Sequence, residues 1–237
     1  MNLVDYEGEA QLLRIENAEQ VRMCLNADWL LTKITAYATR QGLEPELLIH
    51  KVRTDDLFAL TFAKDPGKQS MHQRLAQNAL IQLGCFDEFR LLPQSGKQAY
   101  FVSKDGIPLT GYDAKESKQL GKAVDFFWVH RRSIGTLHAY ASHKYTKEEG
   151  GAQDNQASDL ENFMERARGK STPDNHVFYA LCDGQYYDHP YGSCSSRREW
   201  MNKKLGNERV KALRIDDLKE AWMRDILLWE SRVVKSR

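Results

Sequence analysis

The chain has 237 residues, of which 41% are hydrophobic and 28% charged, with a formal net charge of +1. This composition belongs to a globular protein that can bury a substantial core, and it excludes a disordered or fibrous chain. No apolar run approaches the roughly 18 residues that a membrane span needs, and the acidic start does not look like a secretory signal. We therefore expect a cytoplasmic protein that does not enter a membrane.

The N-terminal part is predicted to mix helix and strand. Residues 18–42 have helical spacing that ends at Gly42, and residues 57–65 suit a strand. The string "KDPGK" at 64–68 breaks the pattern, because Pro and Gly adjoin between charged residues. The sequence therefore predicts a boundary near residue 65, between a small N-terminal α/β region, residues 1–65, and a main domain, residues 66–237.

The main domain begins with a predicted helix that starts at Ser70 and stops at Gly84. Its pattern then predicts two short strands near 86–92 and 98–102 and a helix over 113–120. The turn "RRSIG" joins "KAVDFFWVH", residues 122–130, to "TLHAYASHKYT", residues 136–146, so that the two strands form a hairpin.

The rest of the chain alternates between the two kinds of element. A helix with an apolar stripe follows the hairpin, and then come a strand over 177–182, a loop "HPYGSCSSRRE", and a further strand from residue 209. The pair Asp216 and Asp217 can cap a last amphipathic helix. The predicted fold class is α/β, a mixed central sheet flanked by helices.

Asp125 is the only carboxylate in its predicted apolar strand, and burying it is costly unless it is paired or bound to a metal. Ser142 and Lys144 share one face of the next strand and His143 takes the other, because side chains alternate. Two interpretations stay open. Asp125 and Lys144 form a buried ion pair, or they serve a metal-dependent phosphodiesterase in which the lysine stabilises developing charge.

The corner after this strand, "HKYTKEEGGAQDNQASDLENF" at 143–163, is unusually polar. At about 100° per residue, Gln153 and Gln156 fall within the arc of the helix's apolar stripe, whereas Asp154 and Asp159 lie off it. The amides would then turn toward the sheet and need partners there. Simple capping by Asp154 and an acidic first turn would also account for the composition.

These residues resemble a known superfamily. Asp125 and Lys144 are 19 residues apart, and "SHK" stands where PD-(D/E)XK nucleases have their acid-x-lysine motif. With "KYTKEEGGAQDNQASDL", "VFYALCDGQYY" and "RVKALRIDDL", the chain looks like the type II restriction endonucleases of that superfamily. The resemblance covers residues 64–220 in outline, and it is strongest over 122–190. It implies a restriction-endonuclease-like core in a Mg²⁺-dependent hydrolase that cleaves specific sequences in double-stranded DNA as a homodimer.

The resemblance also assigns roles to residues at matching positions. It makes Asp125 the first metal-binding aspartate and Lys144 the motif lysine, while Val124 replaces the nominal proline. Ser142 stands in place of the second acid, and Asp159, 15 residues beyond the lysine, or Asp154 would then supply that acid from the helix. Gln156 would bind the metal's waters or the nucleophile. An alternative follows from Ser142, namely a DNA-binding, nuclease-like protein that has lost cleavage.

Basic residues near the hairpin turn and in the late loop are candidates for DNA contacts, since arginine can engage guanine edges and lysine often holds phosphates. The N-terminal region is expected to contact DNA or to mediate dimerisation. Zinc binding by Cys182, His189 and Cys194 is a further possibility, although their spacing fits no common zinc pattern. The candidate DNA-binding residues are Arg131, Arg132, Arg197, Arg198, Lys203 and Lys204.

Overall fold

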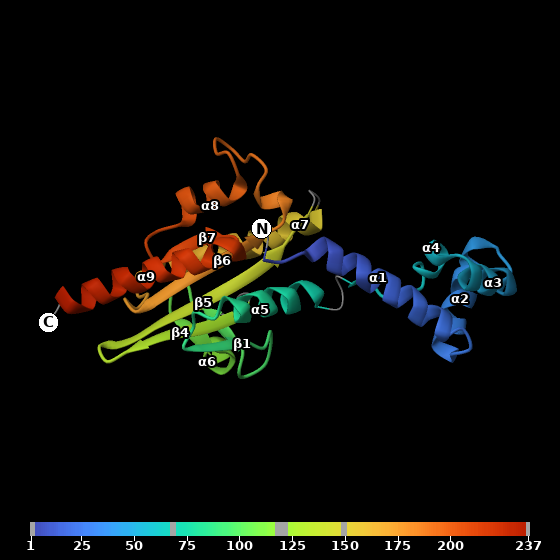
Figure 1. The fold of residues 1–237 in the computed structure, drawn as a ribbon, viewed down its shortest axis with the longest axis horizontal. Helices are drawn as coiled ribbons and strands as arrows, with labels where there is room; N and C mark the ends of the chain where they lie inside the picture. Colours follow the sequence, from blue (N-terminus) through green and yellow to red (C-terminus); the bar gives the residue numbers. More distant parts are fainter. Residues whose placement is uncertain (1–2, 67–69, 117–122, 148–150, 236–237) are drawn as a thin grey trace. The chain divides into compact units, whose positions relative to one another are not determined.

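The computed structural model describes residues 3–66, 70–116, 123–147 and 151–235, and it divides into two compact units (Figure 1). Residues 4–75 form a helical unit, and the residues from Ala76 onward, with Leu3, form a unit built on a sheet. The division falls within helix α5 (Met71–Leu83), later than the boundary expected near residue 65. Within the described residues, no helix combines the length and apolar character that spanning a membrane requires.

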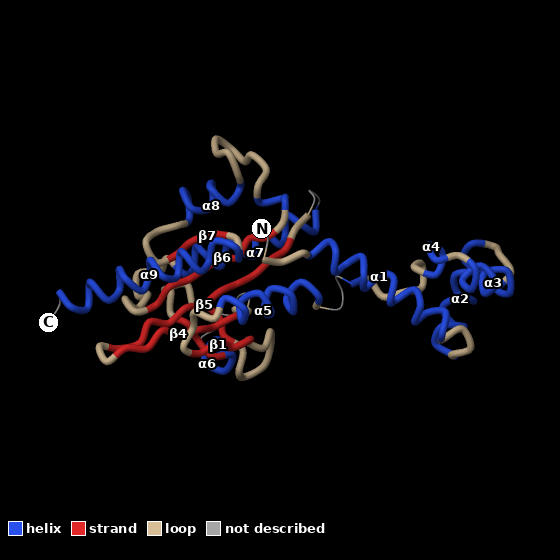
Figure 2. The backbone as a smooth tube through the Cα atoms, viewed as in Figure 1, coloured by secondary structure: helices blue, strands red, loops and turns tan. Residues whose placement is uncertain are grey.

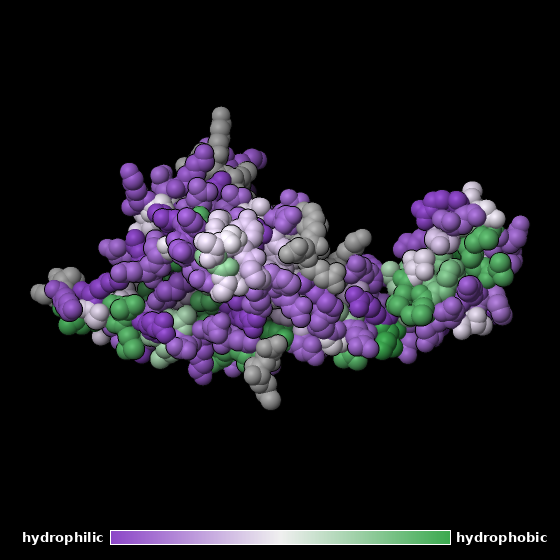
Figure 3. Space-filling view, turned by 90° about the horizontal axis from the view of Figure 1, so that it is seen from above, coloured by the Kyte–Doolittle hydropathy of each residue, from purple (hydrophilic) through white to green (hydrophobic). Residues whose placement is uncertain are grey.

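The helical unit has a small core of its own around Leu30, Ile34 and Val52. Green apolar side chains are also visible on its surface in Figure 3. The helix stop at Gly42 is confirmed, since this residue adopts the left-handed conformation with φ 67°. Its helices are α1 (Tyr6–Met23), α2 (Asp28–Gln41), α3 (Pro45–Thr54) and α4 (Asp56–Ala59).

Two predictions for this unit are wrong. The helical spacing over residues 18–42 belongs to two helices, which are separated by a turn after Met23. Residues 57–65 form no strand, because the Asp55 carboxylate accepts a hydrogen bond from the Phe58 amide at 3.1 Å and starts α4 instead. Phe58 and Phe62 then pack their rings against Tyr37, at centroid distances of 6.4 and 5.5 Å. Helical capping and aromatic packing thus outweigh the strand propensity of this apolar run.

The second unit contains the predicted mixed sheet, whose order is β1-β4-β5-β6-β7. The first three strands pair antiparallel and the last three pair parallel. The predicted hairpin is confirmed as β4 and β5, with Phe126 opposite Ala141 and Arg132 opposite Gly135. The strands are β1 (Glu88–Leu91), β4 (Phe126–Arg132), β5 (Gly135–Tyr145), β6 (His176–Asp183) and β7 (Val210–Leu213), and β2 (Tyr100–Val102) and β3 (Pro108–Thr110) form a separate pair.

Helices cover both faces of this sheet (Figure 2). On one face, called the α7 face, Phe163 and Met201 join Tyr140 and Phe178 in one apolar cluster. On the other, the α9 face, Trp128 stacks on Tyr179 at 5.5 Å and meets Trp222 edge-on. The remaining helices of the unit are α6 (Gly111–Glu116), α7 (Gly151–Ala167), α8 (Arg197–Leu205) and α9 (Ile215–Lys235).

The predicted helices are found with three differences. The helix from Ser70 is confirmed as α5, and the helix expected over 113–120 overlaps α6, although residues 117–122 lie outside the described part. Asp216 and Asp217 lie inside the first turn of α9 rather than before it. Part of the late loop is α8, whose N-terminus is capped because the Ser196 hydroxyl accepts from the Glu199 amide at 3.0 Å.

Candidate active site

Asp125 lies immediately before β4, where hydrogen bonds to two neighbouring segments fix its backbone. Its amide donates to the Ala141 carbonyl and its own carbonyl accepts from the Leu92 amide, both at 2.9 Å. The side chain is only 5% exposed. Its Oδ2 atom accepts from the His143 amide at 2.8 Å and from the Ser142 hydroxyl at 3.2 Å. Both hydrogen bonds fix the orientation of the Asp125 side chain inside the protein.

Strand β5 presents Ser142 and Lys144 on the α7 face, as alternation predicts. Its register against β4 and β6 is continuous, so both residues share the face of Tyr140, which belongs to the α7-face cluster. His143 points to the other face, where its Nε2 atom lies 3.1 Å from Asp183. No carboxylate within the described residues pairs with the half-buried Lys144, so the expected alternative of a buried Asp125–Lys144 ion pair is not formed.

The polar corner joins the end of β5 to the start of α7. Gln156 turns inward as predicted, and its Oε1 atom accepts from the buried Thr146 hydroxyl at 3.0 Å. Asp154 accepts from the Tyr186 hydroxyl at 2.6 Å, while Asp159 is half-buried farther along the helix. The side chain of Gln153 lies outside the described residues. The corner is therefore polar because its side chains bind one another and the ends of the strands.

The strands meet closely at this corner because of Gly184, which follows β6. Its φ is +96°, and a Cβ atom there would lie 2.1 Å from the Thr146 carbonyl oxygen. The Thr146 amide donates to the Asp183 carbonyl at 2.9 Å, which ties the ends of β5 and β6 together. A side chain at position 184 would force these two strand ends apart, and with them the segment that carries Lys144.

Two of the arginines expected to contact DNA are engaged inside the protein. Arg197 is buried and binds Glu161 at 2.8 Å, with its guanidinium group 4.4 Å from the centroid of the Tyr191 ring. Arg198 binds Asp188 at 2.8 Å and the Cys182 carbonyl at 2.9 Å. These contacts hold α8 against α7 and the end of β6.

The other four candidates for DNA contacts have exposed side chains. Lys203 and Lys204 lie in the last turn of α8. Arg131 forms an ion pair with Glu88 of β1, whereas Arg132 reaches Glu230 of α9 at 3.2 Å. The two neighbouring arginines therefore extend to opposite faces of the sheet, and only Arg131 shares the face of Lys144.

Carboxylate oxygens such as those of Asp125 suit a hard cation such as Mg²⁺, which takes one or two protein carboxylates and fills its other positions with water or phosphate oxygens. Asp125 provides one buried carboxylate at the sheet, and α7 carries Asp159 and Asp154. The described residues contain no group of three or more His, Cys, Asp or Glu side chains placed to hold a metal. Cys182, His189 and Cys194 accordingly do not assemble into a zinc site.

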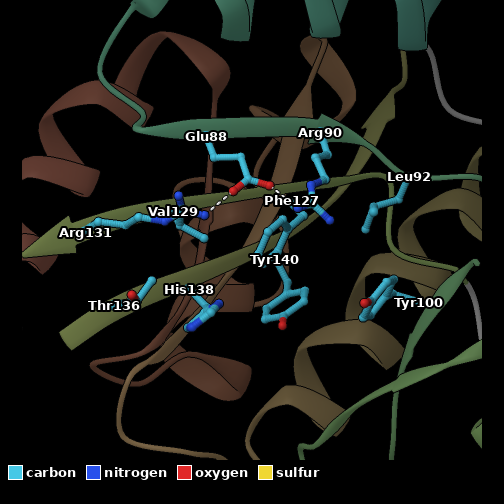
Figure 4. Close-up of a pocket in the computed structure, with 10 residues that line it drawn as sticks. All are labelled: Glu88, Arg90, Leu92, Tyr100, Phe127, Val129, Arg131, Thr136, His138 and Tyr140. Carbon is cyan, nitrogen blue, oxygen red and sulfur yellow. Dashed lines mark hydrogen bonds and ion pairs between the residues drawn. The ribbon is translucent and has the colours of Figure 1, made fainter.

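A pocket of about 300 Å³ opens on the same face, and sequence reasoning missed it (Figure 4). Alternate residues of β4 and β5 line it, so the period-two pattern that placed Lys144 also identifies these residues. Burial, with a further contribution from Arg131, lowers the pKa of His138 in its wall. The pocket is lined by Glu88, Arg90, Leu92, Tyr100, Phe127, Val129, Arg131, Thr136, His138 and Tyr140.

Comparisons of the chain with models of protein families, with curated proteins and with solved structures find no match.

Proposed function

We propose that this protein is a Mg²⁺-dependent type II restriction endonuclease of the PD-(D/E)XK superfamily, which hydrolyses phosphodiester bonds at specific sequences in double-stranded DNA. One observation carries the proposal. A buried carboxylate, Asp125, is held by Ser142 and by the His143 amide, and the same strand presents Lys144 on the face that Ser142 occupies. The resemblance of the sequence and the mixed five-stranded sheet support the same conclusion.

In this proposal Asp125 binds the metal ion, and Asp159 or Asp154 of α7 supplies the second carboxylate. When bound, Mg²⁺ polarises the scissile phosphate and lowers the pKa of a coordinated water. Both acids lie on α7, and Asp154 accepts a hydrogen bond from the Tyr186 hydroxyl. Ser142 keeps the Asp125 side chain oriented, because its hydroxyl donates a hydrogen bond to Oδ2.

Lys144 and Gln156 act on the phosphate and the attacking water. Lys144 carries a positive charge that no described carboxylate neutralises, so it can stabilise the negative charge that develops on the phosphate oxygens. The Gln156 side-chain oxygen accepts a hydrogen bond from Thr146. Its NH₂ group can therefore donate hydrogen bonds to a phosphate or a water. Water then attacks the phosphorus in line with the departing oxygen.

Contacts with the DNA duplex are assigned to the exposed cations. Lys203 and Lys204 of α8 suit phosphate contacts, while Arg131 and Arg132 at the hairpin end suit either phosphates or base edges. Arg197 and Arg198 support this surface from inside. A two-fold homodimer is expected if the recognised sequence is palindromic, because symmetry then repeats one reading surface on the second half-site.

A cleavage assay tests the proposal. Purified protein with Mg²⁺ should cut plasmid DNA into discrete bands, and Asp125→Ala or Lys144→Ala should abolish cutting but leave DNA binding measurable. A second candidate function is a nuclease-like DNA-binding protein without cleavage, and the neutral side chain of Ser142 beside Asp125 favours it. Sequence-specific binding without any cleavage would support this candidate. Cleavage that survives both substitutions would exclude this site.

A further inference from the structure

The pocket lies on the α7 face, which also carries Ser142 and Lys144 of the candidate active site. His138 and Tyr140 of β5 line the pocket, and Ser142 and Lys144 continue along the same face of that strand. Same-face neighbours on a strand are about 7 Å apart. Tyr140 is therefore one such step from Ser142 and two steps, about 14 Å, from Lys144, so the pocket and the lysine can contact nearby nucleotides of one strand.

Four of the ten residues that line the pocket carry aromatic rings. The ring centroids of Phe127 and Tyr140 are 5.1 Å apart, and those of Tyr100 and Tyr140 are 6.3 Å apart (Figure 4). Tyr140 is only 6% exposed and stacks on His176 and Phe178 at 5.4 and 5.6 Å, so it supports the wall from behind. Flat, supported rings are the surfaces on which nucleobases stack, and such stacking tolerates any base.

Charged groups occupy the rim of the pocket. Glu88 forms ion pairs with both Arg90 and Arg131, so that one carboxylate is shared by two guanidinium groups (Figure 4). The side chains of Arg90 and Arg131 are 61% and 60% exposed, and the Arg90 guanidinium lies 5.7 Å from the centroid of the Phe127 ring. The rim therefore keeps a net positive charge beside the aromatic wall, which suits the phosphate of a nucleotide.

We propose that this pocket binds one unpaired nucleobase of the DNA strand against Phe127 and Tyr100, with the strand's phosphate groups facing Arg90 and Arg131. A volume of about 300 Å³ is at the lower limit for ligand sites, so it admits a single base and not a duplex. A paired base inside a duplex cannot reach it and has to be extruded first. The proposal rests on the proposed function in that the bound strand is DNA.

Binding to a bulged duplex tests the pocket without knowledge of the recognition sequence. Fluorescein-labelled duplexes, fully paired or with one unpaired thymidine, are titrated with the full chain in EDTA, and fluorescence anisotropy gives their Kd values. The bulged duplex should bind about tenfold more tightly or better, because its extra base stacks in the pocket at no unpairing cost. Phe127→Leu and Arg131→Ala should each remove most of this preference, whereas Arg224→Ala should keep it. Arg224 is a matched control, an arginine on α9 that is 65% exposed.

Equal affinity for the two duplexes, or a preference that survives both pocket variants, would overturn the proposal, and so would a failure of the wild type to bind either DNA. If circular dichroism shows that Phe127→Leu is partly unfolded, Arg131→Ala alone decides, because that side chain is exposed. The assay contains no Mg²⁺, so it is independent of cleavage. If the wild-type protein cleaves plasmid DNA but does not prefer the bulged duplex, only the proposed base-binding pocket is rejected. If it prefers the bulged duplex but does not cleave DNA, only the proposed nuclease activity is rejected.

Discussion

Asp125→Asn separates a catalytic from a structural role for this residue, because it removes the charge and keeps the shape. Two hydrogen bonds to a carboxylate contribute about 1.5–3 kcal/mol each, and two to a neutral amide oxygen about 0.5–1.5 each, so this substitution costs about 2–3 kcal/mol in hydrogen bonding. Burying the charge of a group that is 5% exposed itself costs several kcal/mol, which the amide avoids. The two effects oppose each other, and the free energy of unfolding should change by less than about 2 kcal/mol.

The effect on cleavage should be far larger. Loss of a metal-binding carboxylate removes several kcal/mol of transition-state stabilisation, and each 1.36 kcal/mol is a factor of ten, so the rate should fall at least about a thousandfold. Urea denaturation measures the first quantity, and single-turnover plasmid cleavage in Mg²⁺ measures the second. Asp225→Asn is the matched control. Asp225 is 3% exposed on the α9 face, where it binds Tyr179 and Lys211, so its replacement should lower stability and leave the activity of the folded protein unchanged.

The reasoning would be refuted by an Asp125→Asn protein that cleaves DNA within about tenfold of the wild-type rate, since no metal-binding role could then account for the buried acid. A loss of more than about 4 kcal/mol in stability, with cleavage falling only in proportion to the folded fraction, would assign Asp125 a structural role instead.

Three further predictions concern the same unit. Lys144→Met should leave the thermal unfolding midpoint within a few degrees of the wild-type value, and DNA binding should stay measurable. It should lower the rate of single-turnover cleavage at least about a hundredfold, because the negative charge that develops on the phosphate in the transition state loses the Lys144 ammonium group. Gly184→Ala should lower the free energy of unfolding in urea by at least about 2 kcal/mol, because a Cβ there would lie 2.1 Å from the Thr146 carbonyl oxygen, whereas Gly96→Ala, also at positive φ but in open space, should cost less. Burial, with a smaller contribution from neighbouring positive charge, lowers the pKa of His176 from 6.5 to about 4, so the neutral imidazole contributes stability that is complete above pH 6.5 and is lost as the pH falls toward 4. The unfolding midpoint should therefore decline over this range, and His176→Phe should remove part of the decline; an identical pH profile for the variant would contradict the assignment.

The elements with a strict hydrophobic period were predictable from the sequence. Alternation along 136–146 identified β5 and the faces of Ser142, His143 and Lys144, because a strand paired on both sides has little freedom to slip in register. The inward turn of Gln156 followed in the same way from the apolar stripe of α7.

The errors arose where local chemistry or distant packing decides the structure. The Asp55 cap and the aromatic contacts of Phe58 and Phe62 turned an expected strand into a helix, and the Ser196 cap started α8 inside an expected loop. Both caps are visible in the sequence once they are looked for. The burial of Arg197 is not, because its partners Glu161 and Tyr186 come from α7 and from the segment after β6. The pocket required knowledge that β1 lies beside β4, a pairing between segments about 40 residues apart in the sequence.

One strand links the proposed chemistry to the stability of the fold. Along β5, His138, Tyr140, Ser142 and Lys144 face α7 and the pocket, whereas Ala139, Ala141 and His143 are buried on the α9 face. Packing on the α9 face fixes the register of the strand. That register fixes the distances along β5 between the pocket residues, Ser142, which contacts Asp125, and Lys144. Substitutions on the α9 face should therefore act on cleavage only through folding. Substitutions of Ser142 and Lys144, on the α7 face of β5, should change cleavage in protein that remains folded, and this difference within a single strand is what a rigid support for positioned groups requires.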